Sequence, residues 1–147
     1  MFLQYLIKLL PTRPIFAHCD IPCGIYDPKP AQLAAQTVLK MVSLINELQP
    51  SSSEPPFDER KKIISQVSRL TRVKEDHAEL CKREVLILWT DYFKEVHLEK
   101  FPDLHDLVWK TTKLCSENKR AVDEAKAQQL VEAVDKIADI FEKTHTH

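Results

Sequence analysis

The feature that most constrains this chain is its glycine content, because Gly24 is the only glycine among 147 residues. Phosphate-binding loops of the G-x-G-x-x-G type and tight two-residue hairpins both need glycine where the backbone takes a positive φ. One glycine excludes nucleotide-binding α/β folds and hairpin-rich β folds together. A chain of this length also forms about one ordinary domain, so a multidomain enzyme is excluded as well.

The prolines and the apolar periodicity favour helices. Eight of the nine prolines lie between Pro11 and Pro56, which leaves the rest of the chain open to long helices. Apolar residues recur at three- and four-residue spacing in four segments, the pattern of amphipathic helices. These segments carry Leu33, Thr37, Val38, Met41, Val42, Ile45 and Leu48; Ile63, Val67, Leu70, Cys81, Val85, Leu88 and Tyr92; Leu104, Leu107, Val108, Thr111, Leu114 and Cys115; and Val122, Leu130, Val131, Val134, Ile137, Ala138 and Phe141.

Four such helices with short connections predict an all-α four-helix bundle over residues 31–143. A proline- and serine-rich linker over residues 50–56 separates the first two, and Pro102 suits the first turn of the third. The apolar stripe of the second helix is interrupted at Lys74 and His77, so these side chains need polar partners if they are buried.

Charge and length limit the partners of this chain. Lys and Arg total 21 against 22 Asp and Glu, so we expect no basic surface for nucleic acid. The apolar start from Met1 to Leu10 is far short of the ~20 residues that span a bilayer, and we expect no membrane partner. A short apolar run that ends at Ala17 is typical of a removable leader over residues 1–17, although the basic start of a secretory signal is absent. The alternative is an N-terminus without such a purpose.

An irregular segment follows, H-C-D-I-P-C-G-I-Y from His18 to Tyr26. Two thiols and an imidazole within six residues favour zinc, copper, nickel or iron over magnesium and calcium. Structural zinc needs four side-chain ligands at familiar spacing, and the sequence has no obvious second Cys or His pair. Cys81, one turn from His77, can complete such a site, although a helical Cys on an apolar stripe is typical of a core. A Cys19–Cys23 disulfide is the other alternative, favoured only in an oxidising compartment.

Cleavage after Ala17 changes the donor set. His18 then gains an α-amine, whose ordinary pKa of about 8 permits coordination. The amine, the amide nitrogen of Cys19 and the thiolates of Cys19 and Cys23 can occupy the corners of a square, an arrangement that favours Cu(II) or Ni(II). The His18 imidazole remains free to approach as an axial ligand.

The run from His18 to Tyr26 closely resembles the nickel-binding hook of nickel-containing superoxide dismutases. The resemblance continues through L-W-T-D-Y-F-K at 88–94 and H-L-E-K-F-P-D-L-H at 97–105, and it covers most of the chain from residue 18. It implies a leader removed by a dedicated peptidase, a domain over residues 18–147 with its hook at 18–26, and a homohexamer of four-helix bundles with one nickel ion per subunit. The implied reaction converts superoxide to dioxygen and hydrogen peroxide by Ni(II)/Ni(III) cycling.

The resemblance also assigns residues. It gives His18 the amine and the axial imidazole, Cys19 a thiolate and an amide nitrogen, and Cys23 the second thiolate. Tyr26 matches a tyrosine beside the open coordination position, where its hydroxyl orders water and limits what approaches; packing of the hook is its other role. Tyr92 matches a second tyrosine near the site, with core packing as the alternative, and Asp20 acts through its backbone.

This chain departs from the family at two positions. Familiar members carry glutamate at Ala34 and arginine at His77, in the network that orients the axial imidazole. His77 can still serve as a hydrogen-bond partner of that ring, or it is an ordinary helix residue. We interpret His97 and His105 as structural, His145 and His147 as an exposed tail, and Lys94 as a charge that helps to steer the anion.

Two alternatives to the enzyme stay open on the residues alone: a non-catalytic helical protein that stores or delivers nickel or copper, and an exported bundle with a Cys19–Cys23 disulfide. Because nickel loading needs reduced thiols, we expect the cytoplasm, with export as the alternative.

Overall fold

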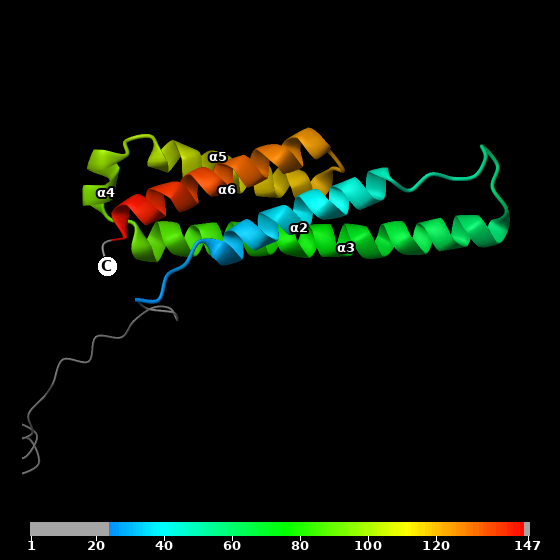
Figure 1. The fold of residues 1–147 in the computed structure, drawn as a ribbon, viewed down its shortest axis with the longest axis horizontal. Coiled ribbons are helices and arrows are strands. Elements are labelled where there is room, and N and C mark those ends of the chain that lie inside the picture. Colours follow the sequence, from blue (N-terminus) through cyan, green and yellow to red (C-terminus); the bar gives the residue numbers. More distant parts are fainter. Residues whose placement is uncertain (1–23, 146–147) are drawn as a thin grey trace, which may run out of the picture.

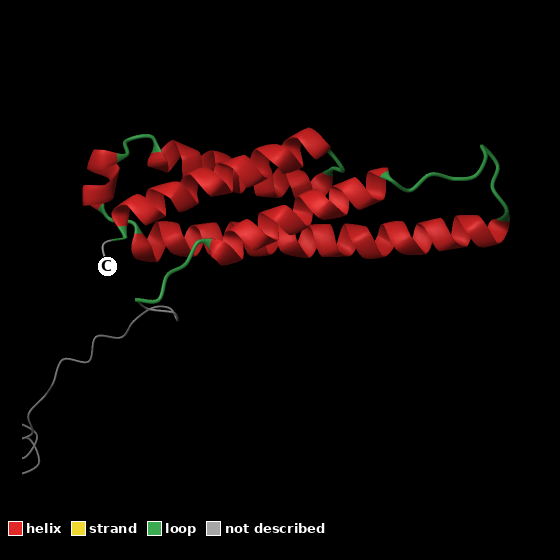
Figure 2. Cartoon of the chain, viewed as in Figure 1, coloured by secondary structure: helices red, strands yellow, loops and turns green. Residues whose placement is uncertain are grey.

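The computed structural model describes residues 24–145, and every regular element in this range is helical (Figure 2). This confirms the all-α class. The elements are α2 Lys29–Asn46, α3 Phe57–Ile87, the π-helical turn η1 Leu88–Tyr92, α4 Glu95–Lys100, α5 Leu104–Arg120 and α6 Glu124–Thr144. None of the helices in residues 24–145 combines the length and the apolarity needed to cross a membrane.

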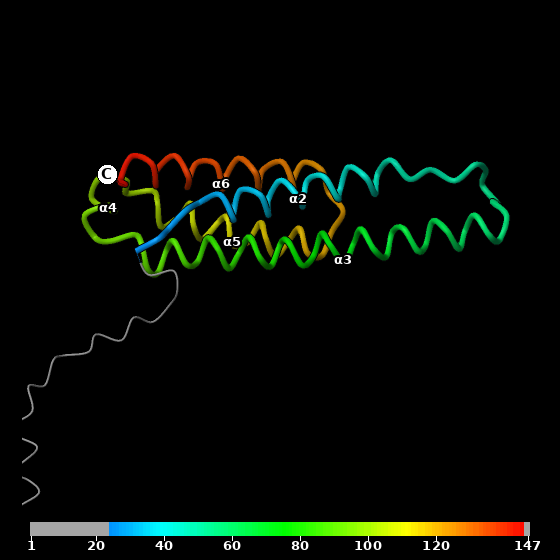
Figure 3. Tube along the Cα trace, turned by 60° about the horizontal axis from the view of Figure 1, so that its bottom comes forward, coloured from blue at the N-terminus to red at the C-terminus, as the bar shows by residue number. Residues whose placement is uncertain are grey.

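The four long helices form a closed bundle in which consecutive long helices run in opposite directions (Figure 1). α2 packs on α3 and α6, and α5 packs on the same two helices, so each helix has two neighbours. The four-helix bundle is therefore confirmed. One end of the bundle holds the chain before α2, η1, α4 and the end of α6, while at the other end the 47–56 loop and the first turns of α3 extend beyond α5 and α6 (Figures 1 and 3). We call the first of these the hook end.

The buried face of α2 differs from the one predicted. Leu33 is 67% exposed, whereas the face packed into the bundle consists of Ala31, Ala34, Ala35, Val38 and Val42. Counting only large apolar residues placed the stripe on the wrong side of the first turns. The three alanines are small, which allows α2 to approach its neighbours closely, and the expectation for Leu33 is wrong.

The polar interruption in α3 has a structural explanation at Lys74. This side chain is buried, and its Nζ donates hydrogen bonds to the carbonyl oxygens of Asn118 and Lys119. Those carbonyls lie in the last turn of α5, where no intrahelical donor reaches them. Lys74 thus caps the end of α5, and desolvation by burial lowers its pKa.

The connection between α3 and α5 is less direct than the periodicity predicted. η1 and the six-residue α4 intervene, and α5 begins at Leu104, so Pro102 lies in the preceding turn rather than in the helix. The outer bounds differ slightly from residues 31–143, since α2 begins at Lys29 and α6 ends at Thr144. At the start of α6, Asp123 Oδ1 accepts a hydrogen bond of 3.1 Å from the amide of Lys126, which fixes that helix terminus.

Candidate metal centre

The predicted nickel ligands His18, Cys19 and Cys23, together with Asp20, lie outside the described residues. The described chain begins directly after Cys23 with Gly24, whose φ of +80° lies in the left-handed region. Residues with a side chain rarely adopt that conformation, so the only glycine stands where the backbone needs one. Two residues further on, Tyr26 is half-buried against the bundle.

Tyr26 and Tyr92 come together at the hook end. Their ring centroids are 5.7 Å apart, and Tyr92 is the centre of a larger group of rings. We call this group the aromatic cluster. The other rings around Tyr92 are Phe141 at 4.4 Å, Phe93 at 5.1 Å, His97 at 5.6 Å and His145 at 6.2 Å between centroids.

The end of α6 contributes both rings and oxygen atoms to this cluster. The hydroxyl of Tyr92 lies 3.0 Å from Oγ1 of Thr144 and 3.5 Å from the carbonyl oxygen of Phe141. His145 is exposed, yet its ring stacks on that of Phe141 at 5.0 Å with 16° between the planes. The tail expected at His145 therefore begins on the aromatic cluster.

Sequence reasoning missed Thr144 and Phe141 as neighbours of Tyr92, because no local pattern reports a contact across about fifty residues. It also gave Asp91 no role of its own. Within the described part of the chain, Oδ2 of Asp91 is buried and lacks a hydrogen-bond partner.

A surface hollow of about 720 Å³ lies between α2 and α3. Ala34 and His77, the two positions at which the resemblance implies a departure from the family, both line it, together with Asp27 near the hook. Nδ1 of His77 is 2.9 Å from the carbonyl oxygen of Val73, and because a carbonyl only accepts, Nδ1 carries the hydrogen. A neutral His77 therefore has Nε2 as an acceptor.

The other two cysteines are structural. Cys81 on α3 and Cys115 on α5 are fully buried, and a hydrogen bond between their thiols, together with burial, raises the pKa of Cys81. A protonated thiol is a poor metal ligand. Residues 24–145 contain no group of three His, Cys, Asp or Glu side chains that could hold a metal ion.

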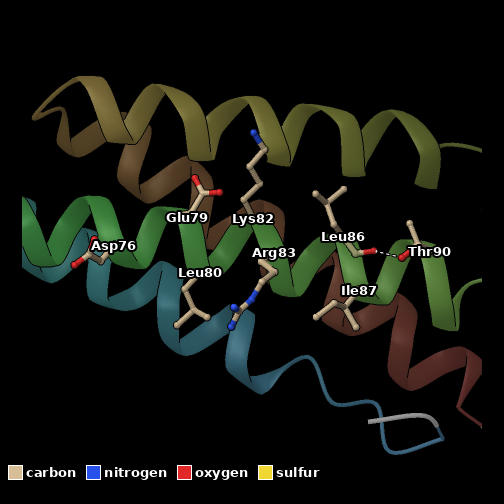
Figure 4. A pocket seen from close by; sticks show the side chains of 8 residues that line it. All are labelled: Asp76, Glu79, Leu80, Lys82, Arg83, Leu86, Ile87 and Thr90. Carbon is tan, nitrogen blue, oxygen red and sulfur yellow. Dashed lines mark hydrogen bonds between the residues drawn. The ribbon is translucent and has the colours of Figure 1, made fainter. Parts of the chain in front are cut away.

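A second hollow, of about 510 Å³, lies on the outer surface of α3 and η1 (Figure 4). Its charged side chains already fasten α3 to α5, since Glu79 pairs with Lys119 at 2.8 Å and Lys82 Nζ donates to Ser116 Oγ at 3.3 Å. Neither a thiol nor an imidazole lines it, so it lacks the donors that a redox metal needs.

Known proteins resemble this chain along most of its length. The family model described as nickel-containing superoxide dismutase matches residues 14–145. The nickel superoxide dismutases of Streptomyces coelicolor and Streptomyces seoulensis are 38% and 36% identical to it over 134 residues, which cover 91% of this chain and 92% of each relative.

Solved structures agree with the sequence relatives. The native structure of a nickel superoxide dismutase superimposes with a TM-score of 0.70 at 37% identity, covering 86% of this chain and 98% of that one. A metal-free structure of a nickel superoxide dismutase gives a TM-score of 0.70 at 34% identity over 82% of this chain. By fold, by extent and by sequence, the chain belongs to the nickel-containing superoxide dismutases.

Proposed function

We propose that removal of residues 1–17 exposes the α-amine of His18, and that this amine, the Cys19 amide nitrogen and the thiolates of Cys19 and Cys23 hold one nickel ion in each subunit. As a family member, the chain is a nickel-dependent enzyme that converts two superoxide anions and two protons to dioxygen and hydrogen peroxide. The observation that supports these ligands is their chemistry, because thiolates and imidazole are the soft ligands that suit nickel. Bound nickel supplies the electron exchange by alternating between Ni(II) and Ni(III).

The chain's own residues bind and shape the approach to this centre. The resemblance gives Tyr26, two residues after Gly24, a phenol that orders water and limits what reaches the hook. Tyr92 supports the ring of Tyr26 from inside the bundle, at 5.7 Å between centroids. Asp20 contributes through its backbone, and the exposed Lys94 adds a positive charge at the hook end that attracts a small anion.

His77 is proposed to orient the imidazole of His18. A metal-bound histidine needs its other ring nitrogen held by an acceptor. In a neutral His77 ring Nε2 is such an acceptor, because Nδ1 donates to the carbonyl oxygen of Val73. The hollow beside Ala34 leaves room for an imidazole at the position where the resemblance implies a glutamate.

The wider setting follows the family resemblance. We propose that a dedicated peptidase removes the leader, that six subunits assemble with their hooks inside, and that the enzyme works in the cytoplasm, where thiols stay reduced for nickel loading. Neither nucleic acid nor a membrane is a proposed partner.

One sample tests the central proposal. Mass spectrometry of the active protein should give His18 as the first residue, and metal analysis of the same sample should give about one nickel per chain. An active protein that still begins with Met1, or one that keeps its rate after nickel is removed, would contradict the proposal. A metal potential outside the range between the two superoxide couples would instead favour storage or delivery of the metal.

A further inference from the structure

The hydroxyl of Thr144 stands at the centre of a small hydrogen-bond network. Its Oγ1 lies 2.9 Å from the carbonyl oxygen of Ile140, 3.0 Å from that of Phe141 and 3.0 Å from the phenol oxygen of Tyr92. The hydroxyl has one hydrogen, and carbonyl oxygens only accept, so Thr144 donates to the backbone of α6. Its oxygen can then accept the hydrogen of Tyr92.

This arrangement fixes the direction of the Tyr92 hydroxyl. The second acceptor within reach, the carbonyl oxygen of Phe141 at 3.5 Å, also belongs to α6. Whichever oxygen accepts, the phenol hydrogen of Tyr92 is directed into the end of α6, while its ring remains available to Tyr26 at 5.7 Å.

Tyr92 needs such an anchor because of its own backbone. It is the last residue of η1, and the amide of Phe93 reaches back five residues to the carbonyl of Leu88 at 3.0 Å. π-Helical backbone is rare and occurs mostly as single turns, so it does not belong to a long regular helix. The position of Tyr92 is therefore set by tertiary contacts. The closest of its ring contacts is with Phe141, at 4.4 Å between centroids.

We infer that Thr144 is a positioning residue of the metal centre. It holds the ring of Tyr92 behind that of Tyr26 and directs the Tyr92 hydroxyl into α6, so that this phenol does not donate a proton at the metal centre. The inference rests on the proposed function, in which Tyr92 lies beside the nickel hook. It assigns the last turn of α6 to the enzymatic site.

The test compares Thr144→Val, which keeps the shape of the side chain, with Thr144→Ser, which keeps the hydroxyl. Thr112→Val is the matched control, because Thr112 also donates to a helix carbonyl, that of Trp109 at 2.8 Å, but lies on α5 away from Tyr92. Two quantities are measured: the tyrosine Cζ signals of the ¹³C-labelled full chain before nickel loading, and the rate per bound nickel after loading. The chain has three tyrosines, so Tyr26→Phe and Tyr92→Phe assign the signals.

In Thr144→Val we expect the Tyr92 signal to shift, the Tyr26 signal to stay, and the rate per nickel to fall about three- to tenfold, the worth of one hydrogen bond. Thr144→Ser should restore both quantities, and Thr112→Val should change neither. An unmoved Tyr92 signal, or a moved signal with an unchanged rate, overturns the inference. Should Thr144→Val fail to fold, Tyr92→Phe must show the same loss of rate.

A further variant separates this inference from the proposed function. If Tyr92→Ala keeps the full rate per nickel, Tyr92 does not lie at the site. The proposed assignment of Tyr92 and the inference about Thr144 then both fail. If Tyr92→Ala loses the rate while Thr144→Val does not, only the role of Thr144 fails.

Discussion

At the scale of the residue, the four cysteines divide into two chemically different pairs. Cys19 and Cys23 flank the proposed metal, while Cys81 and Cys115 are buried with a raised pKa at Cys81. Only a thiolate is an effective ligand, so the core pair does not compete for nickel in the folded chain.

We expect Cys19→Ser and Cys23→Ser each to keep the helical fold and to lose superoxide turnover, because a hydroxyl does not replace a thiolate in making Ni(III) reachable. Circular dichroism and the rate measure the two effects. Cys81→Ala is the matched control, which should keep the rate per nickel and lose about 1 kcal/mol of stability through its small cavity. A serine variant with full activity would contradict the assigned ligands.

His77→Ala tests the second proposed role. We expect a changed electron paramagnetic resonance signal of the nickel-loaded protein and a lower rate, with stability changed by no more than about 0.5 kcal/mol, because the His77 bond to Val73 is exposed. His105→Ala is the control: that exposed imidazole meets the edge of Trp89 at 5.5 Å. Identical spectra and rates in His77→Ala and in the unaltered enzyme would make His77 an ordinary helix residue.

Lys74 and His77 show what a sequence can predict about single positions. Both interrupt one apolar stripe, yet Lys74 is buried on the end of α5 and His77 is half-exposed on the hollow. The need for partners was predictable from polarity and periodicity. Which residue turns inward depends on the angle at which α3 meets α5, and that angle is a property of the packed bundle.

At the scale of the element, the short helix α4 is held at its start by a histidine. The backbone amide of Lys94 donates to Nδ1 of His97 at 3.2 Å, which requires that nitrogen to be unprotonated. Burial of the imidazole, with the charges of Lys94 and Lys100, lowers the pKa of His97.

The folded chain therefore favours neutral His97, and its stabilising effect is complete above the ordinary histidine pKa of about 6.5 and is lost as the pH falls below it. We expect faster hydrogen exchange of the α4 amides at pH 5 than at pH 7.5, after correction for intrinsic rates. His97→Gln keeps an acceptor without a titration and should remove this difference. An equal pH response in His97→Gln would refute the assignment.

The paired thiols between α3 and α5 predict the opposite pH dependence. Because the pKa of Cys81 is raised in the fold, its contribution to stability is complete below the ordinary thiol pKa of about 8.5 and is lost as the pH rises above it. Urea unfolding should show that the unaltered protein loses more stability between pH 7.5 and pH 10 than the double variant Cys81→Ala with Cys115→Ala does. Equal losses in the two proteins would contradict the coupling of these thiols to the fold.

At the scale of the whole molecule, the bundle was predictable and its irregular parts were not. The all-α class and the number of long helices could be predicted from the single glycine, the clustered prolines and the four segments with apolar periodicity. The exposed face at Leu33 was misjudged because alanines, which are weak signals of burial, form the real contact. Likewise η1, α4 and the contact of Tyr92 with Thr144 depend on the closed bundle. The hook ligands His18, Cys19 and Cys23 stay a prediction from donor chemistry and from the resemblance.

We expect the mature protein to have about six times the mass of one chain by light scattering, and variants that lose nickel should report whether assembly needs the metal. Sedimentation over a range of concentrations is the control for weak association. A monomer at working concentration would contradict the proposed homohexamer.

The described chain begins at Gly24 and ends at His145 at the same end of the bundle, and this decides where the protein tolerates a fusion (Figure 1). An N-terminal purification tag would be lost with the leader or would block the amine of His18, and a C-terminal tag would begin beside His145 on the aromatic cluster. The 47–56 loop, at the opposite end, is the place for an inserted label (Figure 1).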